Sequence, residues 1–299
     1  MSKLDLVPLS DKLFLVNAPN EGRFPLSHSF LIRGEKTVLI DTGCGLDVCR
    51  ALMEEFPIEA VYNSHAHPDH IAGNFLFRGI DIFTPDVRSM ETGTLDILAT
   101  RLVGPDPKVM DFWKTFVRQF TGIEDYEATG TFSDGDILDF GGITLQAIHT
   151  PGHLEDHFCF WEPENKILMS FDIDLTGFGP FCGNPESDIQ AFMESLDKVM
   201  ALKPAVAASS HRPPIFKNAG RALQAFQDKF ARNDQSILET LDAPKTLEEI
   251  LALKPIYKKY FPGGEVLYRF FERNMISKHL ARLEVQGRVT LAGGQYRVL

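Results

Sequence analysis

Six consecutive residues of the sequence concentrate groups that bind metal ions. Residues 65–70 read HAHPDH and hold three of the chain's nine histidines together with one aspartate. Residues two apart in an extended chain point to the same side, so His65 and His67 can converge on one ion. The proline that follows can turn the chain into a helix, which would direct Asp69 and His70 toward a second ion nearby. Imidazole and carboxylate ligands suit Zn²⁺, and also iron or manganese.

Two divalent ions held close together carry out hydrolysis by a known chemistry. They lower the pKa of a bound water from about 15.7 toward about 7 and polarise a carbonyl or phosphoryl oxygen. Asp69 can both hold its metal and orient the nucleophile or carry a proton to the leaving group, so we expect it to be catalytic. We expect two zinc ions as cofactors, with iron or manganese as alternatives.

Further motifs follow the same order along the chain as in a known family. Asp41 lies in LIDTG, His153 in TPGH, Asp172 in ILMSFD and His211 in SSH. With HAHPDH after a strand-like run, these motifs resemble those of the metallo-β-lactamase fold superfamily over about residues 12–215. The resemblance implies an αββα sandwich and a binuclear metallohydrolase.

The resemblance also assigns ligands, position by position. One metal would take His65, His67 and His153, the other Asp69, His70 and His211, and the Asp172 carboxylate would bridge them. Asp41 would lie behind the ligands, where carboxylates orient ligand imidazoles, or it would only stabilise the turn at Thr42 and Gly43.

One position departs from the family pattern. The family usually has Gly before the bridging aspartate, and this chain has Phe171. Asp174 would project to the same side of an extended strand as Asp172 and is a rival for the bridge. His157 matches a histidine of the glyoxalase-II branch and is a further candidate ligand. Residues 177–183, GFGPFCG, either line the pocket or form an ordinary loop.

The elements that must position these groups alternate between strands and helices. Short apolar runs bounded by Gly, Asn, Asp and Pro lie at 12–18, 28–34, 36–43 and 58–65, and a second group ends at 205–211. These runs predict strands. Between them, apolar residues at helical spacing predict helices, so the fold class is α/β, with sheets covered by helices.

A helical segment interrupts this rhythm between residues 85 and about 130. Its apolar residues fall on one helical face and comprise Val109, Phe112, Trp113, Phe116, Val117 and Phe120. This pattern is typical of core packing. A lid over the site and a homodimer face are the alternatives.

The pattern changes again near residue 241. We divide the chain into a catalytic domain, 1–240, and a small C-terminal domain, 241–299. Thr246 and Glu249 form a capping box that would begin a helix. A second helix follows, and a hairpin turns at Gly293 and Gly294, where positive φ costs little. Helices followed by a hairpin predict a winged-helix-like domain.

The net charge also differs between the two predicted domains. The net charge is −11, made of +4 in residues 241–299 and −15 in the remainder. The acidic body does not favour a polyanionic partner, so we expect a small-molecule substrate, namely an ester, thioester or lactone. RNA phosphodiester hydrolysis is the alternative, with Lys278, His279, Arg282 and Arg288 as candidate contacts. We favour the interpretation that these four residues form a solvated helix face and that the domain packs on the catalytic domain and walls the pocket.

Three further expectations complete the interpretation. An iron-dependent oxidoreductase is a second alternative function, but the sequence shows no flavin partner domain. The chain starts without an apolar leader and holds no run of about 18 apolar residues, so we expect a cytoplasmic protein without a membrane partner. Four cysteines without CxxC spacing predict buried thiols.

Overall fold

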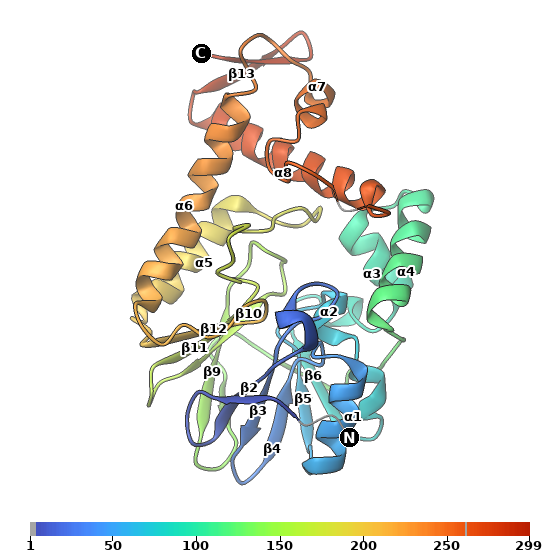
Figure 1. The fold of residues 1–299 in the computed structure, drawn as a ribbon, viewed down its shortest axis with the longest axis vertical. Coiled ribbons are helices and arrows are strands. Elements are labelled where there is room, and N and C mark those ends of the chain that lie inside the picture. Colours follow the sequence, from blue (N-terminus) through green and yellow to red (C-terminus); the bar gives the residue numbers. More distant parts are fainter. Residues whose placement is uncertain (1–3, 261) are drawn as a thin grey trace.

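The computed structural model describes residues 4–260 and 262–299, and its centre is a pair of β-sheets packed face to face (Figure 1). The first sheet has seven strands in chain order: β1 (Leu6–Pro8), β2 (Leu13–Val16), β3 (Ser29–Arg33), β4 (Thr37–Ile40), β5 (Ala60–Tyr62), β6 (Asp81–Pro85) and β7 (Gly130–Phe132). The second has five, in the order β12 (Val206–Ser209), β11 (Ile167–Phe171), β10 (Phe158–Glu162), β9 (Thr144–His149) and β8 (Ile137–Asp139).

Apolar side chains from both sheets form the central core. Leu15 and Phe30 of the first sheet and Leu145, Phe160 and Phe171 of the second belong to one buried cluster. Helix α1 (Leu46–Glu55) covers the outer face of the first sheet, and α5 (Ile189–Ala201) and α6 (Ala219–Leu238) cover that of the second. The predicted α/β class is therefore confirmed, with helices on the outer faces of two sheets.

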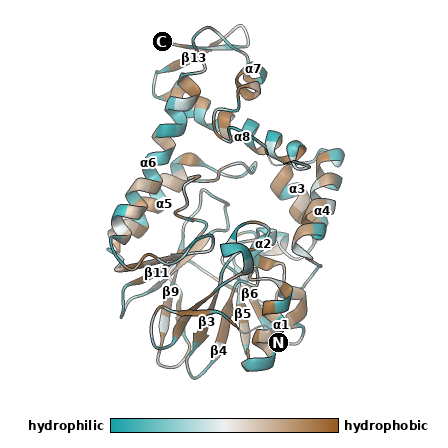
Figure 2. Ribbon diagram, viewed as in Figure 1, coloured by the Kyte–Doolittle hydropathy of each residue, from teal (hydrophilic) through white to brown (hydrophobic). Residues whose placement is uncertain are grey.

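The hydropathy of the elements matches this layering (Figure 2). Strands of both sheets are mainly hydrophobic, whereas α6 and α8 carry hydrophobic and hydrophilic residues side by side. Such helices bury one face against a sheet or a neighbouring helix and leave the other in solvent. Over the described residues, no helix is both long enough and apolar enough to cross a bilayer.

The insertion predicted between residues 85 and 130 contains two α-helices after a short 3-10 helix, Ser89–Glu91. These are α3 (Leu95–Val103) and α4 (Pro107–Thr121), the second capped by the Asp106 carboxylate. Trp113 and Val117 are buried in a cluster shared with Ile71 of the short helix α2 (Pro68–Ile71). Part of the apolar stripe is core, as expected, but Phe120 remains 43% exposed.

The C-terminal elements are two helices and a hairpin. They are α7 (Leu247–Ala252), α8 (Glu265–Val285), β13 (Val289–Ala292) and β14 (Gln295–Val298). The expected capping box of Thr246 and Glu249 is present, and Gly293 and Gly294 both have positive φ at the hairpin turn. Ile237, near the end of α6, shares a buried cluster with Leu280 of α8, so these elements pack onto the long helix that precedes them.

Candidate metal centre

The candidate ligands lie where strands end, at one edge of the sandwich. Strands β4 to β7 run parallel, and so do β11 and β12. Asp41 follows β4, His65 follows β5, His153 follows β9, Asp172 follows β11 and His211 follows β12. Polar groups at the carboxyl ends of strands commonly form the functional site of an α/β fold.

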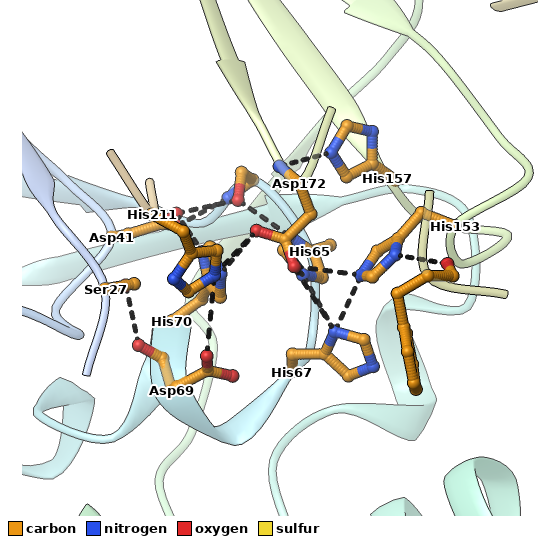
Figure 3. Close-up of polar contacts among 12 residues, drawn as sticks. Ser27, Asp41, His65, His67, Asp69, His70, His153, His157, Asp172 and His211 are labelled. Carbon is orange, nitrogen blue, oxygen red and sulfur yellow. Dashed lines mark hydrogen bonds and ion pairs between the residues drawn. The ribbon is translucent and has the colours of Figure 1, made fainter. Parts of the chain in front are cut away.

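Two groups of potential ligands face each other across Asp172 (Figure 3). In each group the ligand atoms all lie within 4.8 Å of one another: one comprises His65, His67, His153 and Asp172, the other Asp69, His70 and His211. The Asp172 Oδ2 atom is 3.1 Å from His153 Nε2. Its Oδ1 atom is 2.9 Å from His70 Nε2 and 3.2 Å from His211 Nε2. One carboxylate therefore presents an oxygen to each group.

The outer nitrogen of every clustered histidine faces an oxygen. His67 Nε2 lies 2.9 Å from the Asn184 side-chain oxygen, His153 Nδ1 is 3.0 Å from the Phe181 carbonyl and His211 Nδ1 is 2.6 Å from the Gly22 carbonyl. His70 Nδ1 faces Asp41, and His65 Nδ1 faces Ser64 Oγ. A neutral imidazole that donates from its outer nitrogen keeps a lone pair on the inner one. In the neutral form of each ring, these contacts direct the lone pair inward, five in all.

The inner nitrogens are too crowded to be stable without a partner. His67 Nδ1 lies 2.8 Å from His153 Nε2 and 3.1 Å from His65 Nε2. His70 Nε2 and Asp172 Oδ1 are buried and make no hydrogen bond with regular geometry among the described residues. Lone pairs at such distances repel unless a cation or proton lies between them. The donor set, imidazole and carboxylate, fits divalent metal ions of the zinc type.

The ionisation states of these groups differ because their burial and their partners differ. Burial lowers the pKa of His65 and of His67, which keeps both imidazoles neutral. Burial also opposes the charge of His70, but Asp172 and Asp41 together raise the pKa of this histidine well above its ordinary value. The nearby histidines, His70 first, hold the pKa of Asp172 well below its ordinary value despite burial. The central carboxylate is thus ionised at neutral pH.

Asp41 is a buried anchor behind the second group. Its carboxylate accepts hydrogen bonds from the Ser64 amide at 2.8 Å, from Ser64 Oγ at 2.7 Å and from His70 Nδ1 at 2.7 Å. The neighbouring Gly43 is required because a Cβ atom there would lie 1.6 Å from the Asp69 carbonyl oxygen. The LIDTG segment therefore packs directly against helix α2, which carries the candidate ligands Asp69 and His70.

Phe171 explains how this chain departs from the family pattern without losing the site. Its φ is +46°, in the left-handed region that glycine adopts freely. The ring is fully buried and packs edge-on against Phe30, with 5.2 Å between ring centroids. The pairing of β11 with β12 shifts register just before it. The backbone thus takes a path suited to glycine, and the burial of the ring offsets the strain.

Asp174 and His157 lie beside the two groups but outside them. His157 Nε2 is 3.2 Å from the Asp172 backbone amide and accepts its hydrogen, while its Nδ1 faces the Thr150 carbonyl at 3.1 Å. This histidine therefore holds the backbone of Asp172 in place. Asp174 Oδ1 accepts from the Thr176 amide at 2.7 Å, and burial raises the pKa of Asp174 to about 6.

A short loop, residues 181–184, supports the group of His65, His67 and His153 and joins it to the C-terminal helix α8. The carbonyl of Phe181 and the side chain of Asn184 hold His153 and His67, as described above. Asn274 of α8 donates to the Gly183 carbonyl at 2.8 Å, and Lys278 donates to the Cys182 carbonyl at 3.1 Å and to the Asn184 carbonyl. Loop 181–184 is therefore fixed from α8.

Three of the four basic residues proposed as RNA contacts are engaged within the protein. Lys278 binds loop 181–184, His279 is fully buried with Nδ1 2.6 Å from Asp234 Oδ1, and Arg282 pairs with the same aspartate. Arg288 is exposed. These contacts fit the interpretation that the C-terminal elements pack on the body of the protein.

A cavity of about 380 Å³ opens onto the metal-ligand groups. His67, Asp69, His153, Asp172 and His211 line its inner end. Its walls include the insertion helix α4, through Trp113, Phe116 and Val117, and the C-terminal helix α8, through Leu267, Tyr268 and Phe271. Phe178 and Phe181 contribute as well, so the segment 177–183 does line the pocket.

Comparison with known proteins places this geometry in context. The family profile described as the metallo-beta-lactamase superfamily matches residues 22–211. A metallo-beta-lactamase family protein from Thermus thermophilus is similar in structure, with a TM-score of 0.72 and 22% identity over 98% of this chain and 100% of that one. A beta-lactamase domain protein from Burkholderia ambifaria gives a TM-score of 0.75 and 17% identity over 99% and 94%. The shared fold thus includes the C-terminal elements.

The curated relatives match this chain over only part of their own length. A linear primary-alkylsulfatase of Pseudomonas sp. is 26% identical over 76% of this chain, and this chain spans 50% of that protein. An atrochrysone carboxyl ACP thioesterase of Emericella nidulans is 24% identical over 80% of this chain and 67% of the relative. An acyl-coenzyme A thioesterase of Bos taurus is 29% identical over 50% and 58%. The chain therefore spans only half to two thirds of these relatives.

Proposed function

The chain belongs to the metallo-beta-lactamase superfamily, and on this basis we propose that it is a binuclear metallohydrolase that cleaves the thioesters of small molecules. The observation that carries the proposal is the convergence of two ligand groups on the two oxygens of Asp172. His65, His67 and His153 would hold one ion, Asp69, His70 and His211 the other, and Asp172 would lie between them. Zinc is the expected metal, with iron or manganese as alternatives.

Two divalent ions in these positions would lower the pKa of a water molecule and polarise the substrate carbonyl. The chain's own residues supply orientation. The oxygen acceptors behind the histidines fix which ring nitrogen faces inward, and Asp41 does so for His70 through a charged hydrogen bond. The apolar cavity walls lower the local dielectric constant, which strengthens electrostatic interactions at the candidate ligands.

Asp69 is the residue we assign to proton transfer. Its carboxylate lines the inner end of the cavity, 3.7 Å from His211 Nε2. The backbone around it is held by Ser27, whose hydroxyl donates to the Asp69 carbonyl at 2.7 Å. In thioester cleavage, water adds to the carbonyl carbon and the carbon–sulfur bond breaks. Asp69 would take a proton from the attacking water and deliver it to the departing sulfur, giving a carboxylic acid and a thiol.

The choice of thioesters rests on the relatives and on the cavity. Two of the relatives described above bear the name thioesterase. The cavity has a mainly apolar lining, which suits an acyl group better than a polyanion. The engaged state of Lys278, His279 and Arg282 leaves RNA hydrolysis without a specific supporting observation.

We also propose the domain division at residue 240 and a winged-helix-like identity for residues 241–299. The element order of two helices and a hairpin supports it, as does an isolated bridge between Lys245 and Tyr296 of β14. In this proposal the domain serves the active site by walling the cavity through α8.

A metal-removal experiment with Asp69→Asn as a companion tests the proposal. The protein as purified is assayed on acetyl and butanoyl thioesters, then after treatment with a chelator, and then after Zn²⁺ is restored. We expect activity to disappear and return with the metal, and to fall at least about 100-fold in the variant. Thioester hydrolysis that survives complete metal removal would refute the proposal.

A further inference from the structure

The cavity walls allow the substrate to be specified more closely. Resting on the thioesterase proposal, we infer that the substrate carries a bulky, uncharged apolar acyl group, and that α4 and α8 select it. The cavity continues outward from the candidate metal-ligand groups and offers space for the acyl group of a thioester bound there.

The wall from α4 is aromatic. Phe116 faces the cavity and stacks on Phe24, with 5.9 Å between ring centroids and 6° between ring planes. Trp113 and Val117, adjacent on the same helical face, are nearly fully buried and line the cavity below. Phe24 itself is 47% exposed, so it marks the rim. The predicted apolar stripe of α4 therefore serves the cavity as well as the core.

The opposite wall comes from the C-terminal helix. Phe271 of α8 packs edge-on against Phe181 at 5.3 Å, and Phe181 in turn lies 5.8 Å from the ring of His153. Tyr268 of α8 contacts Tyr257 at 5.2 Å, and both line the cavity. A continuous apolar surface thus leads from a candidate metal ligand to α8. Helix α4 also contacts α8 directly, so the two walls meet (Figure 1).

The charges around the cavity argue against a charged acyl group. Within the described part of the chain, Arg23 is the one lysine or arginine in the lining, and it lies at the exposed rim in an ion pair with Glu21. Asp174 is the acidic lining residue outside the two ligand groups. A carboxylate or phosphate carried into the apolar part would lose its hydration without gaining a partner. A volume of about 380 Å³ falls within the range of sites for small organic ligands.

Acyl chain length is the variable that tests the inference. We would measure kcat/KM for N-acetylcysteamine thioesters from acetyl to decanoyl, which share one leaving group, and for the adipoyl thioester, which resembles hexanoyl but ends in a carboxylate. Each buried methylene should raise kcat/KM about fourfold until the cavity is filled. The adipoyl thioester should fall at least about tenfold below hexanoyl.

Two matched pairs of variants show which residues cause the dependence of kcat/KM on acyl chain length. Phe116→Ala and Phe271→Ala remove cavity walls, whereas Phe112→Ala and Phe270→Ala remove half-buried rings of the same helices that do not line it. We expect the first two variants to flatten the chain-length dependence and the second two to preserve it. Equal effects in both pairs would indicate general destabilisation and contradict the inference.

The outcomes separate this inference from the proposed function. Metal-dependent hydrolysis with no dependence on chain length would overturn the inference and leave the function intact. If no thioester is cleaved, the function fails, and calorimetry with decanoate on the metal-loaded protein still decides the inference. Binding with a negative heat-capacity change that Phe116→Ala weakens would support an apolar acyl site, and no binding would refute it.

Discussion

Replacing Asp41 by Asn should weaken one metal site and spare the other. Asp41 has a φ of +60°, a conformation that asparagine tolerates well, and the substitution keeps its shape. The Asn oxygen can still accept from the Ser64 amide, but the Asn amide group would then face His70 Nδ1, donor against donor. His70 would have to move its proton to Nε2, the nitrogen that faces Asp172. The ligand lone pair would be lost.

The expected loss of metal affinity follows from the hydrogen bond between Asp41 and His70 that the substitution removes. A hydrogen bond between an imidazole and a buried carboxylate contributes about 1.5–3 kcal/mol, and loss of such a partner lowers metal affinity roughly 10- to 100-fold. We would titrate metal-free protein with Zn²⁺ against a chromophoric chelator and resolve two dissociation constants. The matched variant Asn184→Ala, behind His67, should weaken the other constant instead. Equal loss at both sites, or none at either, would refute the reasoning.

The remaining predictions concern strain, charge and nucleic acid. Phe171→Gly should relieve about 1 kcal/mol of backbone strain but lose about 3–5 kcal/mol of packing, so urea denaturation should show lower stability; a gain would contradict this. Burial alone would raise the pKa of Glu186, but the Arg101 guanidinium outweighs burial and lowers it. The carboxylate therefore stabilises the fold above about pH 4.5, and this stability is lost as the pH falls through the lowered pKa. Glu186→Gln should therefore cost about 2 kcal/mol at pH 7 and less at about pH 3, and an equal cost at both would exclude the ion pair as its source. Single-stranded RNA should show no salt-dependent binding, because Lys278 and His279 are engaged internally; binding that strengthens steeply at low salt would contradict this.

The clustering of the candidate ligands could be predicted because each lies in a short motif defined by its side chains. The spacing of residues 65–70 placed imidazoles and a carboxylate close together, and the structure gathers them with His153, Asp172 and His211 at strand ends. Strand patterns also predicted the α/β class, since buried strands have continuous apolar runs.

Other features carry no comparable signal. The acceptors behind His153 and His211 are backbone carbonyls, which any residue type supplies. The cavity depends on α4 and α8 meeting, and these helices are far apart in the sequence. The sequence shows Phe171 where the family usually has Gly, but the left-handed φ of this residue follows from packing that only the folded chain defines. Supporting contacts and specificity therefore come from tertiary structure.

Metal stoichiometry tests the central claim most directly. Metal-free protein would be equilibrated with excess Zn²⁺, freed of unbound metal and measured by inductively coupled plasma mass spectrometry beside an Asp172→Ala variant. Two ligand groups joined by one carboxylate predict about two equivalents of zinc per chain and about one or fewer in the variant. Protein that retains no zinc, or a variant that still binds two ions with unchanged affinity, would contradict a binuclear centre built on Asp172.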